Sequence, residues 1–156
     1  MKKLHAAILL LILLIILLPI VAICVAKAET MYVIVQDELN VRARPSLGSR
    51  VHGRLFTGDQ VEVVRTYNGW CYLEGLHSEE GVGWISGKYV VSDPVNEMID
   101  TTAVIKASGR VAIRDCVDGK RIAWAQPGDV VTVYGASDSW SVTDRGYVKT
   151  EYLVFR

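Results

Sequence analysis

The sequence predicts an all-β protein made of two small barrels in tandem, placed after an N-terminal hydrophobic helix. Three observations predict this architecture: an uncharged apolar run at residues 6–25, short apolar–polar alternations through the remaining chain, and a set of landmarks that occurs twice. Alternation with a period of two places successive side chains on opposite faces of a strand. Glycine and proline interrupt such runs roughly every 8–12 residues in small sandwiches and barrels.

The apolar run "AAILLLILLIILLPIVAICV" (6–25) contains no charged side chain. As a helix rising about 1.5 Å per residue, it is long enough to cross a hydrocarbon core of roughly 30 Å. Lys2 and Lys3 precede this run. They predict that the N-terminus stays in the cytoplasm and that the remainder of the chain is exported.

Residues 1–28 are expected to be a signal peptide or an N-terminal membrane anchor. The segment "AKA" (26–28) resembles a signal-peptidase site before Glu29, and Pro19 divides the apolar run into pieces of signal-peptide length. An uncleaved run would instead anchor the chain in the membrane, and a third alternative is a lipoprotein with its lipid on Cys24. All three place the rest of the chain outside, either extracellular at the cell wall or membrane-anchored with the C-terminal part exported.

The charge distribution argues against nucleic acid as a partner. Lys2, Lys3 and Lys27 account for three of the 17 basic residues, whereas all 17 acidic residues follow residue 28. The exported part therefore has 14 basic against 17 acidic residues, a net charge of −3. Its charges of both signs are interspersed along the chain. Nucleic-acid binding depends on clustered Lys and Arg, so we predict no nucleic-acid partner.

The same landmarks occur on both sides of a break at residues 92–102, "SDPVNEMIDTT", where Asp93-Pro94 signals a turn. The matching pairs are Val41-Arg42 with Ile113-Arg114, Gly58-Asp59 with Gly128-Asp129, Asn68-Gly69-Trp70 with Asp138-Ser139-Trp140, and residues 83–90 with residues 146–153. We therefore predict one domain at residues 31–91, a linker at residues 92–102 and a second domain at residues 103–156.

The first copy resembles the bacterial SH3 (SH3b) domain family. Residues 39–90 carry the family's L-N-V-R start, its N-G-W turn, its G-W element and a closing Tyr-Val pair. The second copy is degenerate: Ala112 replaces the Asn, the turn Pro is missing, and Tyr147 replaces the second Trp. The resemblance implies two small SH3-like barrels, the second of them a divergent member.

Strand alternation predicts which side chains face the barrel cores. The residues assigned to the first core are Leu39, Val41, Ala43, Trp84 and Tyr89. The residues expected on the surface beside a turn are Tyr67, Trp70 and Tyr72. The aromatic residues that correspond in the second copy are Trp124, Tyr134, Trp140, Tyr147 and Tyr152.

The sequence predicts no enzyme activity. The segment "RDCVDG" (114–119) faintly resembles the nucleophile segment of NlpC/P60 cell-wall peptidases, but Val117 stands where that family has Ser, and no His follows Cys116. A thiol without a nearby base has no evident activation. His52 and His77 lack the ligand spacing of compact zinc sites. We therefore predict no catalytic residue, no metal site and no cofactor.

Two cysteines remain in the exported part, Cys71 and Cys116. They could form a disulfide in an oxidising compartment, or each could be a small apolar side chain packed separately. The sequence leaves both alternatives open.

The expected function is binding. The resemblance implies recognition of cell-wall peptidoglycan, through its peptide stem or cross-bridge, in a groove between the long first loop and the strand of Trp70. Aromatic side chains with a polar tip suit such surfaces. The predicted ligand-binding residues are Asn40, Arg42, Arg44, Tyr67, Trp70, Tyr72 and Trp84. Arg42 has an alternative role, a structural hydrogen bond that holds the first loop in place.

A second function stays open at this point. The chain could be a protein–protein interaction or assembly module of an envelope complex, such as a secretion or conjugation apparatus, because a degenerate second copy can lose wall contacts and keep a packing role. The expected partners are thus peptidoglycan or an envelope protein, together with the membrane through residues 6–25 if that run is uncleaved.

Overall fold

The computed structural model describes residues 27–74 and 82–156, and their regular structure is almost entirely β. Helical structure in these ranges is limited to two 3-10 turns, η1 (Gly87–Tyr89) and η2 (Thr150–Tyr152). Neither range contains a helix long and apolar enough to span a membrane. The all-β prediction is confirmed. The predicted N-terminal hydrophobic helix, with its role in export or anchoring, lies outside the described residues.

The strands form two seven-stranded sheets of the same order. The first sheet, in chain order, contains β1 (Glu29–Val33), β2 (Leu39–Arg42), β3 (Val51–Leu55), β4 (Gln60–Tyr67), β5 (Trp70–Glu74), β6 (Val82–Ser86) and β7 (Val90–Val91). The second contains β8 (Asn96–Ile105), β9 (Val111–Arg114), β10 (Arg121–Ala125), β11 (Val130–Ala136), β12 (Trp140–Thr143), β13 (Gly146–Lys149) and β14 (Leu153–Phe155).

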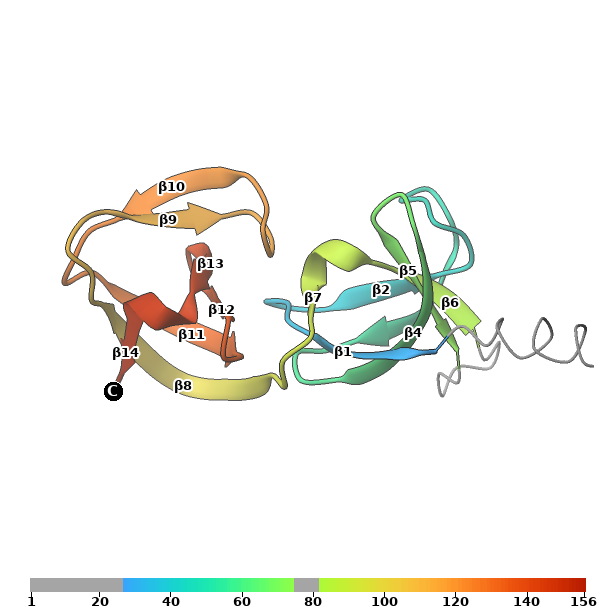
Figure 1. Ribbon diagram of the computed structural model, residues 1–156, viewed down its shortest axis with the longest axis horizontal. Helices are drawn as coiled ribbons and strands as arrows, with labels where there is room; N and C mark the ends of the chain where they lie inside the picture. Colours follow the sequence, from blue (N-terminus) through green and yellow to red (C-terminus); the bar gives the residue numbers. More distant parts are fainter. Residues whose placement is uncertain (1–26, 75–81) are drawn as a thin grey trace, which may run out of the picture.

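The spatial orders are β3-β2-β6-β5-β4-β1-β7 and β10-β9-β13-β12-β11-β8-β14. Each strand of the second sheet thus occupies the place of the strand seven positions earlier in the chain. The repeat predicted from sequence landmarks is seen as a repeated topology. We call residues 29–91 the first unit and residues 96–155 the second unit. They lie side by side and are joined by the connection from β7 to β8 (Figure 1).

The second unit begins earlier than the sequence predicts. β8 starts at Asn96, inside the predicted linker at residues 92–102, and pairs with β11. A register shift interrupts this pairing between Thr101 and Glu97. Such a bulge breaks the apolar–polar alternation on the bulged strand, which explains why the segment resembles a linker in sequence. The connection between the units is therefore only residues 92–95.

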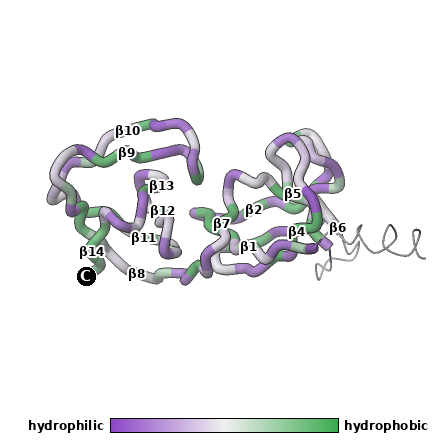
Figure 2. The backbone as a smooth tube through the Cα atoms, viewed as in Figure 1, coloured by the Kyte–Doolittle hydropathy of each residue, from purple (hydrophilic) through white to green (hydrophobic). Residues whose placement is uncertain are grey.

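Each sheet curls around an apolar core of its own. All seven strands of the first unit contribute to one buried cluster, and a flat sheet could not bring seven strands around a single cluster. Leu39 and Val41 point into this core as predicted, but Ala43 is exposed because β2 ends at Arg42. The alternation of hydrophobic and hydrophilic stretches along both sheets is visible in Figure 2.

The repeated Gly-Asp pair makes the same turn in both units. Gly58 and Gly128 have φ values of 93° and 92°, a conformation that glycine adopts at no steric cost. The side chains of Asp59 and Asp129 each accept a hydrogen bond from the backbone amide three residues earlier, at 2.7 Å and 3.0 Å. These turns set the register of the strands on either side of them.

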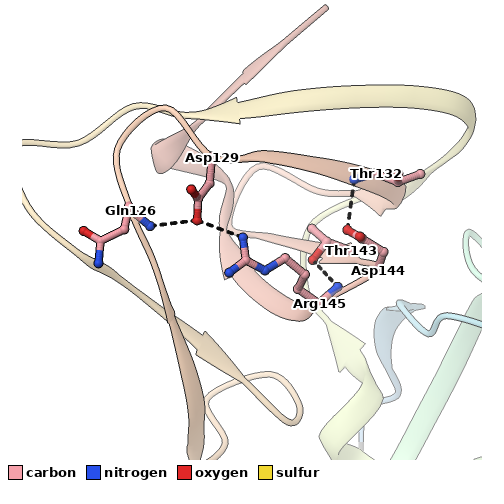
Figure 3. Close-up of polar contacts among 6 residues, drawn as sticks. All are labelled: Gln126, Asp129, Thr132, Thr143, Asp144 and Arg145. Atoms are coloured by element: carbon pink, nitrogen blue, oxygen red, sulfur yellow. Dashed lines mark hydrogen bonds and ion pairs between the residues drawn. The ribbon is translucent and has the colours of Figure 1, made fainter.

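In the second unit the same turn is tied to the hairpin that joins β12 and β13 (Figure 3). Arg145 donates a hydrogen bond to the Asp129 carboxylate at 2.9 Å. The amide of Gln126 and then the Arg145 guanidinium lower the pKa of the Asp129 carboxyl. Asp144, beside Arg145, accepts a hydrogen bond from the amide of Thr132 at 3.0 Å. The start of β11 is therefore linked twice to one hairpin.

The two units pack against each other through a third apolar cluster. Its fully buried members are Ile34, Val91 and Val95 from the first unit and its connection, and Trp140, Val142 and Tyr147 from the second unit. β12 is consequently buried on both faces, whereas the corresponding β5 alternates between buried and half-buried side chains. The second unit presents the outer face of its sheet to the first unit.

Two hydrogen bonds between described residues cross this interface. The buried Tyr147 hydroxyl donates to the Ile34 carbonyl at 3.0 Å, and the Val117 amide donates to the Lys88 carbonyl at 3.2 Å. Burial first, and then the nearby Tyr89 and Cys116, raise the pKa of the Tyr147 phenol far above its usual value. The phenol is thus held neutral, with its polar tip satisfied inside an apolar contact.

Replacing Gly135 with Val should disturb the contact between the units. A Cβ atom at position 135 on β11 would lie 2.4 Å from the Cγ2 methyl of Thr57 in the first unit. Thr57 is held in place because its hydroxyl exchanges hydrogen bonds with the backbone of Val35. Overpacking costs about 1–3 kcal/mol, so urea denaturation of Gly135→Val should show a loss of that size. Gly109→Val is the control, since nothing lies within 4 Å of a Cβ there; equal losses in the two variants would contradict the close approach.

Tyr147→Phe should cost about 1 kcal/mol of stability at pH 7, because it removes one buried hydrogen bond. The cost should shrink above pH 10. The pKa of the Tyr147 phenol is raised in the folded state. As the pH rises through about 10, the phenol therefore ionises in the unfolded chain before it ionises in the folded chain. The wild type then loses stability that the Phe variant does not lose. Paired urea denaturations at pH 7 and pH 10.5 measure this difference. A difference that stays constant with pH would show that Tyr147 is not held neutral at the interface.

Candidate functional site

A groove lies beside Trp70, where the loop between β2 and β3 faces β5 and η1. It consists of two adjoining hollows of about 310 and 500 Å³, which share Leu47, Trp70, Ser86 and Tyr89. We call these two hollows together the Trp70 groove. A concave, aromatic surface with a few polar groups is the usual form of a ligand site.

The two hollows lead away from Trp70 in different directions. The smaller one runs along residues 35–40 and ends at Tyr147 of the second unit. The larger one runs past residues 45–46 toward Lys88. The groove is therefore built mainly by the first unit, and the second unit completes one end of it.

The position of Trp70 follows from the turn that precedes it. Asn68 and Gly69 have φ values of 46° and 77°, the pair of positive values that defines a two-residue type I′ hairpin turn. This turn starts β5 at Trp70 and sends Cys71 into the core. By alternation Trp70 points outward, opposite Ser86 on β6, and stays half-buried at the groove.

Arg42 holds the wall of the groove. Its Nη1 atom donates hydrogen bonds to the carbonyls of Leu47 at 2.7 Å and Ser49 at 2.8 Å. A guanidinium that binds two carbonyls of one loop fixes that loop's conformation. The structure therefore gives Arg42 the structural role, and Arg114 repeats it in the second unit by donating to the Gly119 carbonyl at 2.7 Å.

The two ends of the Trp70 groove differ in charge. Asp37 and Glu38 line the smaller hollow, and Lys88 lines the larger one. Glu38 forms an ion pair with Arg54 at 3.0 Å, which offsets part of its charge. Asp37 is exposed and has no salt-bridge partner among the described residues. Arg42 lines the smaller hollow as well, with its guanidinium bound to two loop carbonyls. The groove thus has carboxylates at one end and Lys88 at the other, on either side of its aromatic centre.

Tyr72 and Trp84 form a separate aromatic surface on the outer face of the sheet. They are opposite each other on β5 and β6, with ring centroids 5.0 Å apart. The Arg65 guanidinium lies 4.4 Å from the Tyr72 ring centroid and 5.2 Å from that of Trp84. Trp84 is half-buried and lies outside the core cluster, so its assignment to the core was wrong. Its neighbour across the strand pair is on the outer face, and strand register places Trp84 there too.

The predicted site residues therefore fall into three groups. Asn40, Arg42 and Trp70 line the groove together. Tyr72 and Trp84 form the outer aromatic surface. Arg44 and Tyr67 are exposed and line neither hollow.

Most residues that line the groove were not predicted as site residues, among them Asp37, Leu47, Ser86, Lys88 and Tyr89. Leu47 and Ser86 carry no local signal, because their role depends on how the first loop folds back on the strands. Lys88 and Tyr89 belong to the 3-10 turn η1, beside the closing Tyr-Val pair of the motif. Tyr89 packs against both the first core and the interface cluster, so its predicted burial is correct in part.

The two cysteines of the described chain are both free and buried. Burial, and then the hydrogen bond and charge of Asp115, raise the pKa of the Cys116 thiol. Burial also raises the pKa of the Cys71 thiol. A raised pKa lowers the fraction of nucleophilic thiolate at neutral pH. Of the histidines considered as ligands, His52 lies in β3 and His77 is outside the described residues.

The curled sheet with a groove at one mouth defines a small β-barrel domain of the SH3-like class. The family model of the bacterial SH3 domain matches residues 37–91. The first unit is a bacterial SH3 domain, as the motif at residues 39–90 predicts. The match does not cover the second unit, which has the same strand order as the first.

Other comparisons reach further along the chain but are weak. No curated protein matches the chain. Two solved structures, NlpC1 and NlpC2 from Trichomonas vaginalis, are 13% and 15% identical, with TM-scores of 0.36 and 0.33. The alignments cover 85% and 84% of this chain and 48% and 49% of those chains. The chain thus spans about half the length of each.

Arg42→Ala should loosen the loop at residues 43–49. Loss of two charge-assisted hydrogen bonds at a half-buried site should lower the free energy of unfolding by about 1–2 kcal/mol. Amide hydrogen exchange should also accelerate at Ala43, whose amide bonds to the Arg50 carbonyl across this loop. Arg44→Ala is the matched control, because its side chain is exposed and holds no loop carbonyl. Equal exchange rates in the two variants would refute the structural role of Arg42.

Proposed function

We propose that the protein is an exported, non-enzymatic module that binds bacterial cell-wall peptidoglycan through the Trp70 groove. One observation carries this proposal: a bacterial SH3 domain presents a half-buried Trp at the centre of a shallow groove of mixed charge. The family match supports a cell-wall role in general terms. The ligand and the exported location are part of the proposal.

The chemistry of the groove suits a peptide from the wall. Stem peptides and cross-bridges carry amino groups, carboxylates and short apolar side chains within a few residues of each other. Asp37 and Lys88 lie at opposite ends of the groove, so an amino group would bind at the first and a carboxylate at the second. Trp70 and Tyr89 would pack against the apolar part, where aromatic side chains give large contact area at low entropic cost.

The second unit supports this role by shaping the groove. Tyr147 lines the end of the smaller hollow while its hydroxyl is bonded to the Ile34 carbonyl. Residues 35–38 follow Ile34 directly and line the same hollow. Docking of the second unit therefore fixes the backbone of one groove wall before a ligand arrives. Such pre-organisation raises affinity by reducing the entropy lost on binding.

A second candidate function is protein–protein assembly in an envelope complex. The outer aromatic surface of Tyr72, Trp84 and Arg65 favours it, because the equivalent surface of the second unit is already covered by the first. This function requires a protein that copurifies in stoichiometric amount from envelope extracts and is lost when Trp84 is replaced.

Trp70→Ala should abolish most of the binding to isolated cell walls. The full chain, in a mild non-ionic detergent, would be mixed with purified sacculi and pelleted, and the bound fraction measured at several protein concentrations. Removal of a central aromatic contact usually costs at least about 2 kcal/mol, which is a more than tenfold loss of affinity. Trp84→Ala is the matched control, since the same residue type is removed from the neighbouring strand outside the groove.

Wild type and Trp84→Ala should pellet to a similar extent, and Trp70→Ala should stay mostly in the supernatant. Wild-type protein that remains wholly in the supernatant would rule out wall binding. Equal pelleting of Trp70→Ala and wild type would place the contact elsewhere on the surface.

A further inference from the structure

The second unit has a hollow of its own, of about 510 Å³, in the position that corresponds to part of the Trp70 groove. It runs along residues 107–112, as the smaller hollow of the Trp70 groove runs along residues 35–40, and it includes Arg114 and Tyr152, the counterparts of Arg42 and Tyr89. We call it the Trp124 hollow, after the aromatic side chain that lines it.

The Trp124 hollow does not keep the aromatic centre of the first unit. The counterpart of Trp70 is Trp140, which is only 3% exposed and belongs to the interface. In its place Trp124 on β10 lines the hollow and is 39% exposed. The second unit thus has a different flat surface available to a ligand.

Cationic side chains gather around this surface. The guanidinium carbons of Arg110 and Arg121 lie 4.9 Å and 4.5 Å from the Trp124 ring centroid. Lys149 lines the hollow as well, with its ammonium 4.2 Å from the centroid of the Trp140 ring. Three segments of the second unit therefore bring positive charge to one place, although residues 29–156 as a whole have a net negative charge.

Within the described residues, positive charge at this hollow exceeds negative charge. None of the ion pairs in the described part of the chain involves Arg110, Arg121 or Lys149. Among the lining residues the single carboxylate of Glu151 stands against the three cations Arg110, Arg114 and Lys149, and it raises the pKa of the neighbouring Tyr152 phenol. Two guanidinium groups beside one ring repel each other, and an anion bound near them would offset that repulsion.

We propose that the Trp124 hollow is a second binding site, which takes a phosphate-bearing ligand. Guanidinium groups form paired hydrogen bonds with phosphate oxygens, and an ammonium adds a point charge beside them. A phosphate group with two negative charges matches the excess of cations better than a single carboxylate does. The exposed face of Trp124 would pack against the apolar or flat part of the ligand. This site is independent of the Trp70 groove and of its proposed ligand.

The chain offers a direct readout, because its four tryptophans report on different places. They are Trp70 in the groove, Trp84 on the outer aromatic surface, Trp124 in the hollow and Trp140 in the interface. The full chain, labelled with 5-fluorotryptophan in non-ionic detergent, would be titrated with inorganic pyrophosphate and followed by fluorine NMR. Each resonance would be assigned with a Trp→Phe variant.

Pyrophosphate should shift the Trp124 resonance in a saturable manner and leave that of Trp70 unchanged, whereas sodium chloride of equal ionic strength should shift neither. In the double variant Arg110→Gln, Lys149→Gln the apparent Kd should rise at least about tenfold, equivalent to about 1.4 kcal/mol. Arg65→Gln is the matched control, because it removes a guanidinium from an aromatic pair in the first unit. An unchanged midpoint of urea denaturation would show that each variant is folded, since removal of Lys149 changes the Trp140 resonance directly.

A second arm identifies the source of the phosphate. Micelles doped with phosphatidylglycerol would be compared with micelles doped with phosphatidylcholine. A Trp124 shift with phosphatidylglycerol as well as pyrophosphate would assign a lipid headgroup, and a shift with pyrophosphate alone would assign a soluble or polymeric phosphate.

No Trp124 shift up to about 10 mM pyrophosphate, beyond the range of useful affinity, would overturn the proposal. An equal shift in the double variant and the wild type would do the same. Neither result bears on sacculus binding, which Trp70 controls.

Discussion

The contact that the rest of the structure depends on is the burial of the outer face of β12 and β13 against the first unit. Trp140, Val142 and Tyr147 would otherwise present an apolar surface to water. Barrels of about 60 residues bury too little surface to be strongly stable alone, so this shared cluster stabilises both units. It also places Tyr147 at the end of the Trp70 groove. The Trp124 hollow stays on the surface, where the Trp124 side chain is 39% exposed.

The interface explains why the second unit differs from the first on the outer face of its sheet. The first unit has Arg65, Tyr72 and Trp84 on its outer face, where they form an exposed aromatic and cationic surface. The strand order places Gly135, Val142 and Tyr147 at the corresponding positions of the second unit. These residues are smaller or less polar, and they permit close packing against Thr57 and Ile34. Tyr147, which departs from the family pattern at the second Trp, thus packs between the units, whereas Ala112, another departure, lines the Trp124 hollow.

Local patterns in the sequence were sufficient to predict the strands and turns. Alternation gave the inward direction of Leu39 and Val41, and the Gly-Asp and Asn-Gly pairs marked turns that do require positive φ. Side-chain roles that depend on tertiary contacts could not be predicted in this way. Alternation does not say which face of a strand is covered, so Trp84 was wrongly assigned to the core. The start of β8 was missed because a bulge interrupts the alternation there. The cationic cluster was equally hidden, because Arg110, Arg121 and Lys149 are dispersed along the chain and meet only in the folded unit.

The central claim is that the two barrels form one rigid body, in which the second completes the groove of the first. Backbone ¹⁵N relaxation on the full chain tests it most directly, because the rotational correlation time can be fitted separately for amides of β1–β7 and of β8–β14. The account predicts the same correlation time and one common diffusion tensor for both sets. Two different correlation times, with independent motion of each barrel about residues 92–95, would contradict it.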